Sequence, residues 1–237
     1  MKIKCIWEHN GSDTLLYSGT AAGAFARGAS KDEALRKMPS EIISFMRWKG
    51  IDIPDIKEKD IEIIQEKSSA LDIRDADSDV IFESEKKPLT SGEYEALKAL
   101  ALKSAADFLT LYEAVPDKNK SVLPYRKTFY GDVPRTAEEM YLHTKNVNAY
   151  YFGEIGINAD NDGTILECRE RGFKRLEESP DFLSSQVFTG SYNEEWSLPK
   201  VLRRFIWHDR IHAKAMYRMA AVTFGRNSVP DIFRFES

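Results

Sequence analysis

The sequence is poor in cysteine and histidine and has no long hydrophobic run. Its 237 residues include only two cysteines, Cys5 and Cys168, and four histidines. Two cysteines this far apart, in a chain without a signal peptide, are typical of a reducing compartment rather than of a disulfide-linked secreted fold. No apolar stretch is long enough to cross a bilayer, and the first residues lack the apolar core of a signal peptide. We therefore expect a cytoplasmic protein that does not enter a membrane.

The sequence also lacks the charge of a nucleic-acid-binding protein. There are 34 basic and 38 acidic residues, and the resulting formal net charge of −4 gives no electrostatic attraction for a polyanion. Neither a serine–histidine–aspartate arrangement nor a glycine-rich phosphate loop is visible. What is present is a hydrophobic fraction of 42%, which can supply a core, and a length of 237 residues, which is enough for one large domain or two small ones.

Residues 1–82 have the pattern of a small α+β domain with three strands, a helix and a fourth strand. Polar and apolar residues alternate in the first strand, and Asn10-Gly11 is the turn signal after it. The capping box Ser30-Lys31-Asp32-Glu33 opens the helix, which runs towards Trp48. The strands are expected at residues 2–7, 14–17, 24–28 and 60–64.

Residues 90–237 have the pattern of a four-helix bundle. Capping boxes at Thr90–Glu93 and Thr136–Glu139 open the first two helices, Asp162 is the expected N-cap of the third, and Ser197 precedes the fourth. The connection at residues 114–136 is long enough to cross the bundle, so a simple up-and-down order is not assured. The predicted fold class is α+β, with a small N-terminal α/β-sandwich-like domain at residues 1–82 followed by the bundle. The four helices are expected to end near Ala114, Gly156, Glu178 and Gly225.

Three of the four histidines occur where a metal ion would need them. His208 and His212 are four residues apart in the fourth predicted helix, so they project from one face of it. His143 lies on the expected inner side of the second predicted helix. The two histidines of the fourth helix belong to a core-facing stripe with the period of a bundle helix, made of Val201, Phe205, His208, His212, Ala215, Met219 and Val222.

Two interpretations of these histidines compete. A single histidine on an apolar helix face is more often a hydrogen-bonded core residue than a ligand, and a histidine pair at this spacing also arises by chance. Three imidazoles directed into one bundle instead favour a divalent metal site with an open position, the ligand count of many catalytic zinc sites. The donor set suits zinc or nickel, with iron, manganese or copper as alternatives. His9 lies in the strand region and is expected to be structural.

Carboxylates near the histidines are candidates for orienting them, since ligating imidazoles usually donate to an acidic group. Glu139 precedes His143 by one turn, and Asp209 adjoins His208 but points about 100° away around the helix. A solvated surface carboxylate is the alternative for both. Glu154 shares a face with His143 and could be a pocket acid, although a surface residue at a helix end is the simpler interpretation.

Other reactive side chains are expected to be structural. Cys168 lies beside the charged run Glu167–Arg171, which has the pattern of a solvated face and gives no sign of a lowered thiol pKa. Three basic residues near the start of the fourth helix could attract an acidic substrate, although a scattered basic surface is the default interpretation. They are Lys200, Arg203 and Arg204.

The C-terminal part, about residues 90–235, resembles the DinB-like superfamily of metal-binding four-helix bundles. The resemblance is carried by Thr136–His143, Trp196–Leu202, Trp207–His212 and the tail Val229–Phe235. The family's metal triad is one histidine on the second helix and a His-x-x-x-His on the fourth, which implies His143, His208 and His212 as ligands here. Several members are thiol-dependent S-transferases, isomerases or hydrolases, so the resemblance implies fold and metal better than it implies a reaction.

The N-terminal part, about residues 1–65, resembles a HicB-like domain through the segment Gly23–Leu35. HicB antitoxins commonly add a DNA-binding segment, and none is evident here because the bundle occupies that place. The resemblance therefore implies a module for packing, dimerisation or covering a substrate.

These observations predict a metal-dependent transferase or hydrolase that acts on a small molecule, with a low-molecular-weight thiol as one candidate partner. The alternative is a non-enzymatic metal-binding regulator in which the HicB-like domain contacts a partner. Family members often form dimers, so a homodimer is a further expectation from the resemblance.

Overall fold

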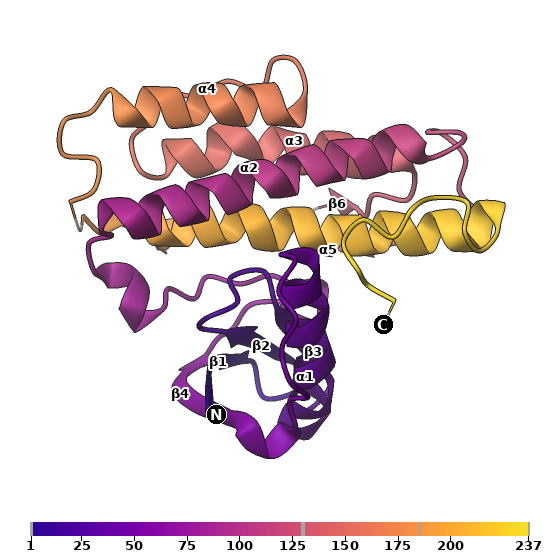
Figure 1. The fold of residues 1–237 in the computed structure, drawn as a ribbon, viewed down its shortest axis with the longest axis horizontal. Helices are drawn as coiled ribbons and strands as arrows, with labels where there is room; N and C mark the ends of the chain where they lie inside the picture. The colour runs from indigo at the N-terminus through magenta and orange to yellow at the C-terminus, as the bar shows by residue number, and fades with distance from the viewer. Residues whose placement is uncertain (1, 129–130, 185, 237) are drawn as a thin grey trace. The chain divides into compact units, whose positions relative to one another are not determined.

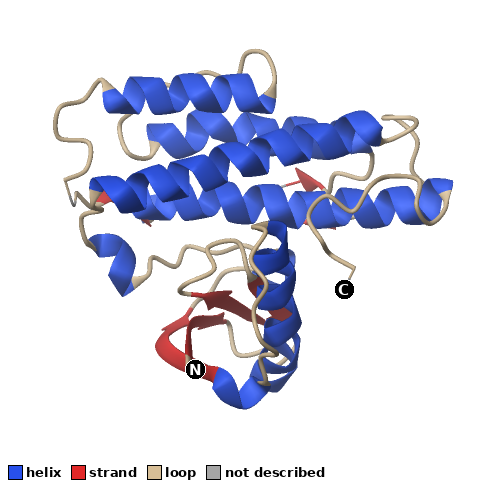
Figure 2. Cartoon of the chain, in the orientation of Figure 1, coloured by secondary structure: helices blue, strands red, loops and turns tan. Residues whose placement is uncertain are grey.

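The computed structural model describes residues 2–128, 131–184 and 186–236 and divides the chain into two compact units (Figure 1). Unit 1 is Met1–Glu83 together with Phe233–Ser237, and unit 2 is Ser84–Ile232. The predicted α+β class is confirmed. The larger sheet lies in unit 1, and most of the helical residues lie in unit 2 (Figure 2).

The C-terminal tail differs from the prediction, which placed it with the helices. Phe233 is fully buried in unit 1, where its ring stacks on Trp48 with the ring centroids 5.3 Å apart. The Ser44 hydroxyl donates a 2.6 Å hydrogen bond to the backbone carbonyl of Arg234. An aromatic anchor and a backbone hydrogen bond thus hold the tail in unit 1.

Unit 1 is a four-stranded sheet with one long helix. The strands are β1 (Ile3–His9), β2 (Thr14–Ser18), β3 (Phe25–Gly28) and β4 (Ile61–Ser68), in the order β3-β2-β1-β4. The first three pair antiparallel, and β4 pairs parallel with β1. Helix α1 (Lys31–Trp48) packs against β2 and β3, and the Ser30 side chain accepts from the backbone N–H of Glu33 as the capping box predicts.

His9 has the structural role that the sequence suggested. Its ring stacks on Trp7 with centroids 4.1 Å apart, and its Nε2 atom lies 3.1 Å from the carboxylate of Glu66. Both contacts stay within the sheet of unit 1, so His9 is not a member of the histidine cluster described below.

The described part of unit 2 contains four α-helices. They are α2 (Ser91–Ala114), α3 (Ala137–Gly153), α4 (Ile165–Glu177) and α5 (Leu198–Phe224). Short two-stranded ribbons lie in the connections, β5 (Lys127–Thr128) with β6 (Gly131–Asp132) and β7 (Phe188–Thr189) with β8 (Glu195–Trp196). None of the helices in the described ranges is both long enough and apolar enough to span a bilayer. Within the described residues, 3-10 turns also occur at Glu58–Asp60 and Ile73–Asp75 in unit 1, at Glu83–Lys86 on the boundary between the units, and at Ser191–Asn193 in unit 2.

Capping residues explain where these helices begin. Thr90, Thr136 and Ser197 are the N-caps of α2, α3 and α5, as predicted, and each side chain accepts a backbone N–H of the first turn. The prediction for α4 was wrong by two residues, because the N-cap is Thr164 rather than Asp162. Thr164 and Glu167 form a complete capping box there.

The connection that crosses unit 2 is the one between α3 and α4, and not residues 114–136. Helix α3 begins beside the end of α2, since the Tyr112 hydroxyl contacts the carboxylate of Glu138. The chain then runs back along α3, so that Asn161 caps the backbone N–H of Ala149 and α4 begins beside the Tyr141 hydroxyl. Helices α3 and α4 therefore run parallel to each other. Helix α2 packs against α4 and α5, and helix α3 also packs against both of them.

Candidate metal centre

Helices α3 and α5 bring three histidines together in unit 2. Each of His143, His208 and His212 offers one ring nitrogen, and these three atoms all lie within 4.8 Å of one another. The ring centroid of His143 lies 5.2 Å from that of His208 and 4.6 Å from that of His212. Two nitrogens on one zinc ion lie at most about 4.2 Å apart, because zinc–nitrogen bonds are about 2.0–2.1 Å long. The 4.8 Å limit is close to this span, so small side-chain rotations would bring the three nitrogens to one ion.

The helix phase accounts for this convergence. His208 and His212 are one turn apart on α5, and His143 lies about two turns into α3, which packs against α5. Most of the predicted stripe on α5 is buried, but Val222 at its end is 61% exposed and belongs to the surface. The predicted stripe therefore faces the core through the centre of the helix, where the histidines lie, and reaches the surface in the last turn.

Burial favours the neutral, metal-binding form of the imidazoles of His143 and His208. Burial lowers the pKa of His143, and it lowers the pKa of His208 well below the ordinary value, with neighbouring histidines adding to the shift. Both rings are therefore neutral at pH 7, and a neutral imidazole has a lone pair to donate. His208 is buried, and its Nδ1 atom has no hydrogen-bond partner among the described residues. A buried polar atom without a partner is unfavourable unless a ligand or a water contacts it.

Neither predicted orienting carboxylate acts on a histidine. Glu139 closes the capping box of α3, where its carboxylate accepts the backbone N–H groups of Arg135 and Thr136. Asp209 is fully buried rather than solvated, and it points away from His208 to other partners. Neither carboxylate therefore orients a histidine. Glu139 is exposed, as the alternative of a surface carboxylate predicted, whereas Asp209 is buried.

Asp209 belongs to a fully buried network that joins three helices. Arg169 on α4 forms a bidentate ion pair with Asp209, with Nη2 3.1 Å from Oδ1 and Nη1 in contact with Oδ2. Ser104 on α2 donates a 2.8 Å hydrogen bond to the same carboxylate. The Arg169 guanidinium also lies over the ring of Phe205, 4.1 Å from its centroid. The run Glu167–Arg171, predicted to be solvated, is therefore divided, because Arg169 is buried with Cys168 while Glu167 and Glu170 are exposed.

Cys168 is structural, as the sequence suggested. The side chain is fully buried and its thiol donates to the backbone carbonyl of Ile165. Burial raises the pKa of the thiol, which opposes formation of the thiolate that a nucleophile requires.

The three basic residues at the start of α5 do not form a scattered surface. Lys200 is fully buried, lies 2.8 Å from Glu194, and has a pKa that burial lowers to about 8. Arg203 forms a bidentate pair with Glu85. The Arg204 guanidinium lies over aromatic rings and 3.6 Å from the same Glu194 carboxylate. The interpretation as a scattered basic surface was therefore wrong, because the first turns of α5 are packed against other side chains instead of facing solvent.

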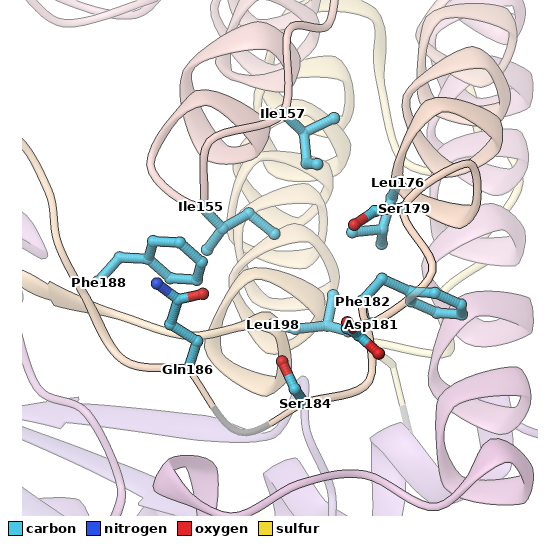
Figure 3. Close-up of a pocket in the computed structure, with 10 residues that line it drawn as sticks. All are labelled: Ile155, Ile157, Leu176, Ser179, Asp181, Phe182, Ser184, Gln186, Phe188 and Leu198. Atoms are coloured by element: carbon cyan, nitrogen blue, oxygen red, sulfur yellow. The ribbon is translucent and has the colours of Figure 1, made fainter.

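A separate cavity of about 80 Å³ lies at the other end of the helices, and its lining contains none of the three histidines. Figure 3 shows apolar side chains around its interior and polar side chains from the connection before α5 at its rim. The lining consists of Ile155, Ile157, Leu176, Ser179, Asp181, Phe182, Ser184, Gln186, Phe188 and Leu198.

The chain's own residues carry the functional argument. A scan of protein-family models, a search of curated proteins and a search of solved structures each found no match. Among the described residues, the three histidines are the one group of three or more metal-binding side chains whose ligand atoms converge.

Proposed function

We propose that unit 2 is a DinB-like four-helix bundle in which His143, His208 and His212 hold a divalent metal ion. We further propose that the protein is a metal-dependent transferase or hydrolase of a small molecule. The observation that carries the proposal is the convergence of three ligand nitrogens within 4.8 Å. The partnerless Nδ1 atom of buried His208 and the lowered pKa values of His143 and His208 support the same conclusion.

The chemistry follows from the donor set. Three neutral nitrogen ligands leave at least one position open on the ion, which is the arrangement of catalytic rather than structural zinc sites. A divalent ion held in this way supplies a Lewis acid that lowers the pKa of water towards neutrality or binds a thiolate. Zinc and nickel suit the imidazole set first, with iron or manganese as alternatives.

The burial of the ligands supports an enzyme over a purely structural site. His208 is buried, whereas His143 and His212 are both partly exposed. Two ligands that reach the surface leave a way for a small molecule to approach the ion, and a sealed structural site would bury all three. Burial disfavours protonation of His143 and His208, so these two ligands favour the metal-binding neutral form.

For unit 1 we propose a HicB-like fold with a binding rather than a catalytic role. The order of three antiparallel strands, a helix and a parallel fourth strand supports this fold. The described residues of unit 1 contain no converging group of three metal-binding side chains, so the proposed chemistry belongs to unit 2.

The first test is the metal content of native, untagged protein, measured by mass spectrometry. About one divalent ion per chain is expected in the wild type and none in a His143/His208/His212 triple alanine variant. His9→Ala is the matched control, because it removes the fourth histidine from unit 1 and should retain the ion. Absence of metal after reloading with zinc, nickel and iron would overturn the site.

Activity is tested separately with a screen of thiol-transfer and hydrolysis substrates on the metal-loaded protein. Turnover is expected to require the ion and to be lost in His143→Ala. A folded, metal-loaded His143→Ala protein with unchanged turnover would contradict a catalytic ion. Stoichiometric metal with no turnover on any substrate would favour the non-enzymatic regulator.

A further inference from the structure

A second candidate site in unit 2 centres on the buried carboxylate of Glu154, the residue that caps the C-terminus of α3. Glu154 is only 7% exposed, which corrects the expectation of a surface residue at a helix end. It lies in a surface hollow formed by the end of α3 and the segment that precedes α5, here named the Glu154 hollow. Its main lining residues are Tyr150, Gly153, Glu154, Phe188, Gly190 and Ser191.

Glu154 differs from the other buried acids of unit 2 because it has no cation as partner among the residues that the structure describes. Glu85 is paired with Arg203, and Asp209 is paired with Arg169. Among the described residues, Glu154 receives only one hydrogen bond, a 2.6 Å bond from the backbone N–H of Ser191 to Oε2. A buried carboxylate is stable when it is paired and fully hydrogen-bonded, so its second oxygen is an open acceptor.

The backbone around Glu154 is shaped to approach the carboxylate closely. A Cβ atom on Gly190 would lie 1.7 Å from Oε2 and 2.6 Å from the Trp196 ring, so only glycine fits there. Gly153 has no atom within 4 Å of the position its Cβ would take, which leaves that side of the hollow open. One oxygen is thus held against the Gly190–Ser191 backbone while the hollow gives access to the other.

The walls of the hollow combine aromatic, apolar and uncharged polar residues around Glu154, and no basic residue of the described ranges lines it. Tyr150 is 37% exposed, and after burial the charge of Glu154 is the next cause that raises its pKa, which places the phenol in the field of the carboxylate. Phe188 lines both this hollow and the cavity of Figure 3, so its ring supplies apolar surface beside the site. The nearby acid Glu194 is already held by Lys200 and Arg204.

We infer that the Glu154 hollow binds a small primary alkylammonium ion. An ammonium group has three N–H donors and a positive charge, which match an open carboxylate oxygen beside an aromatic ring. An inorganic divalent cation fits less well, because calcium takes six to eight oxygen ligands and the hollow offers one open carboxylate oxygen. The ammonium group lies beside the ring of Tyr150, and the alkyl chain contacts Phe188, which binds hydrocarbon rather than a second charge.

The test is a titration of the full-length, metal-free protein with n-butylammonium, followed by backbone amide NMR. Saturable shifts are expected for Gly153, Gly190 and Ser191, and the neutral analogue 1-butanol should give none of comparable affinity. Metal-free protein excludes coordination of the amine by an ion, so the result does not depend on the three histidines. No saturation, or equal saturation by butanol, would overturn the proposal.

Glu154→Gln removes the charge but keeps an oxygen that accepts from Ser191, so the fold should persist. Butylammonium affinity is expected to fall at least tenfold, and unchanged affinity would contradict the site. Glu170→Gln is the matched control, since it removes an exposed carboxylate on α4 outside the hollow and should bind as the wild type does. If Glu154→Gln does not fold, Tyr150→Leu decides the question, with an expected loss of about threefold from the missing cation–π contact.

Discussion

Two buried polar groups lie side by side on α5 and behave differently. The carboxylate of Asp209 is matched by an arginine and a serine, so both of its oxygens have hydrogen-bond donors. The adjacent His208 has a buried Nδ1 atom with no partner among the described residues, and its ring centroid lies 5.2 Å from that of His143 and 4.5 Å from that of His212. The Asp209 carboxylate is satisfied by its neighbours, although the Nε atom of Arg169 has no partner among the described residues. His208 resembles a site that awaits a ligand.

The difference teaches how to separate structure from function in a helical core. Buried polar groups that satisfy one another hold helices in place, and buried polar groups that lack partners are kept only where something else supplies the interaction. The Asp209 network joins α2, α4 and α5 without using the histidines. The histidine cluster joins α3 and α5, and the proposed ion would complete it.

The largest expected effect on the free energy of unfolding comes from breaking the ion pair between Asp209 and Arg169. Asp209→Ala leaves the Arg169 guanidinium buried without its counter-ion, and the free energy of unfolding should fall by about 3–5 kcal/mol. Chemical denaturation monitored by circular dichroism measures this loss. The Asp209→Leu/Arg169→Met double variant removes both charges and should recover most of the stability. If the double variant is as unstable as the single one, the charge pair is not the cause.

A smaller change in the free energy of unfolding is expected when a metal ion binds to the three histidines. Zinc at a free concentration 100 times its dissociation constant should raise the free energy of unfolding by about 2.7 kcal/mol, or the midpoint by about 5–10 °C. Chelation should reverse the shift in the wild type and in His9→Ala, and have little effect in His208→Ala. Equal chelator sensitivity of wild type and His208→Ala would contradict the site.

The sequence predicts most of the local structure because capping and periodicity are local signals. Thr90, Thr136 and Ser197 cap their helices as expected, and the helical phase places the three histidines on facing sides of α3 and α5. Even the error at α4 had a visible signal, because Thr164-Ile165-Leu166-Glu167 is itself a capping box.

The roles of the acidic residues could not be predicted in the same way. Asp209 was expected to be solvated because it points about 100° from His208, but residues 205–210 of α5 are all buried, so this helix has no solvated side at that level. Its partners Ser104 and Arg169 lie 105 and 40 residues away in the sequence. Glu154 is buried by a segment 36 residues further on, and only the tertiary structure brings the two together.

The smallest expected effect is the pH dependence of the metal-free protein, and it tests whether the cluster is incomplete. Burial lowers the pKa of His143 and His208 below the value of about 6.5 that both have when unfolded. As the pH falls below 6.5, the unfolded chain therefore binds protons that the folded chain does not, and the free energy of unfolding decreases. Each histidine contributes at most about 1.4 kcal/mol per pH unit until its folded pKa is reached.

Urea denaturation of the metal-free protein between pH 7 and pH 5 measures this slope. His208→Leu removes the more strongly shifted group, so its stability should depend less on pH than that of the wild type. Asp209→Asn is the contrasting variant, since it alters the neighbouring network and leaves both histidines in place to titrate. An identical slope in the wild type and His208→Leu would mean that His208 is already satisfied in the absence of metal, and the distinction between the two buried groups would then disappear.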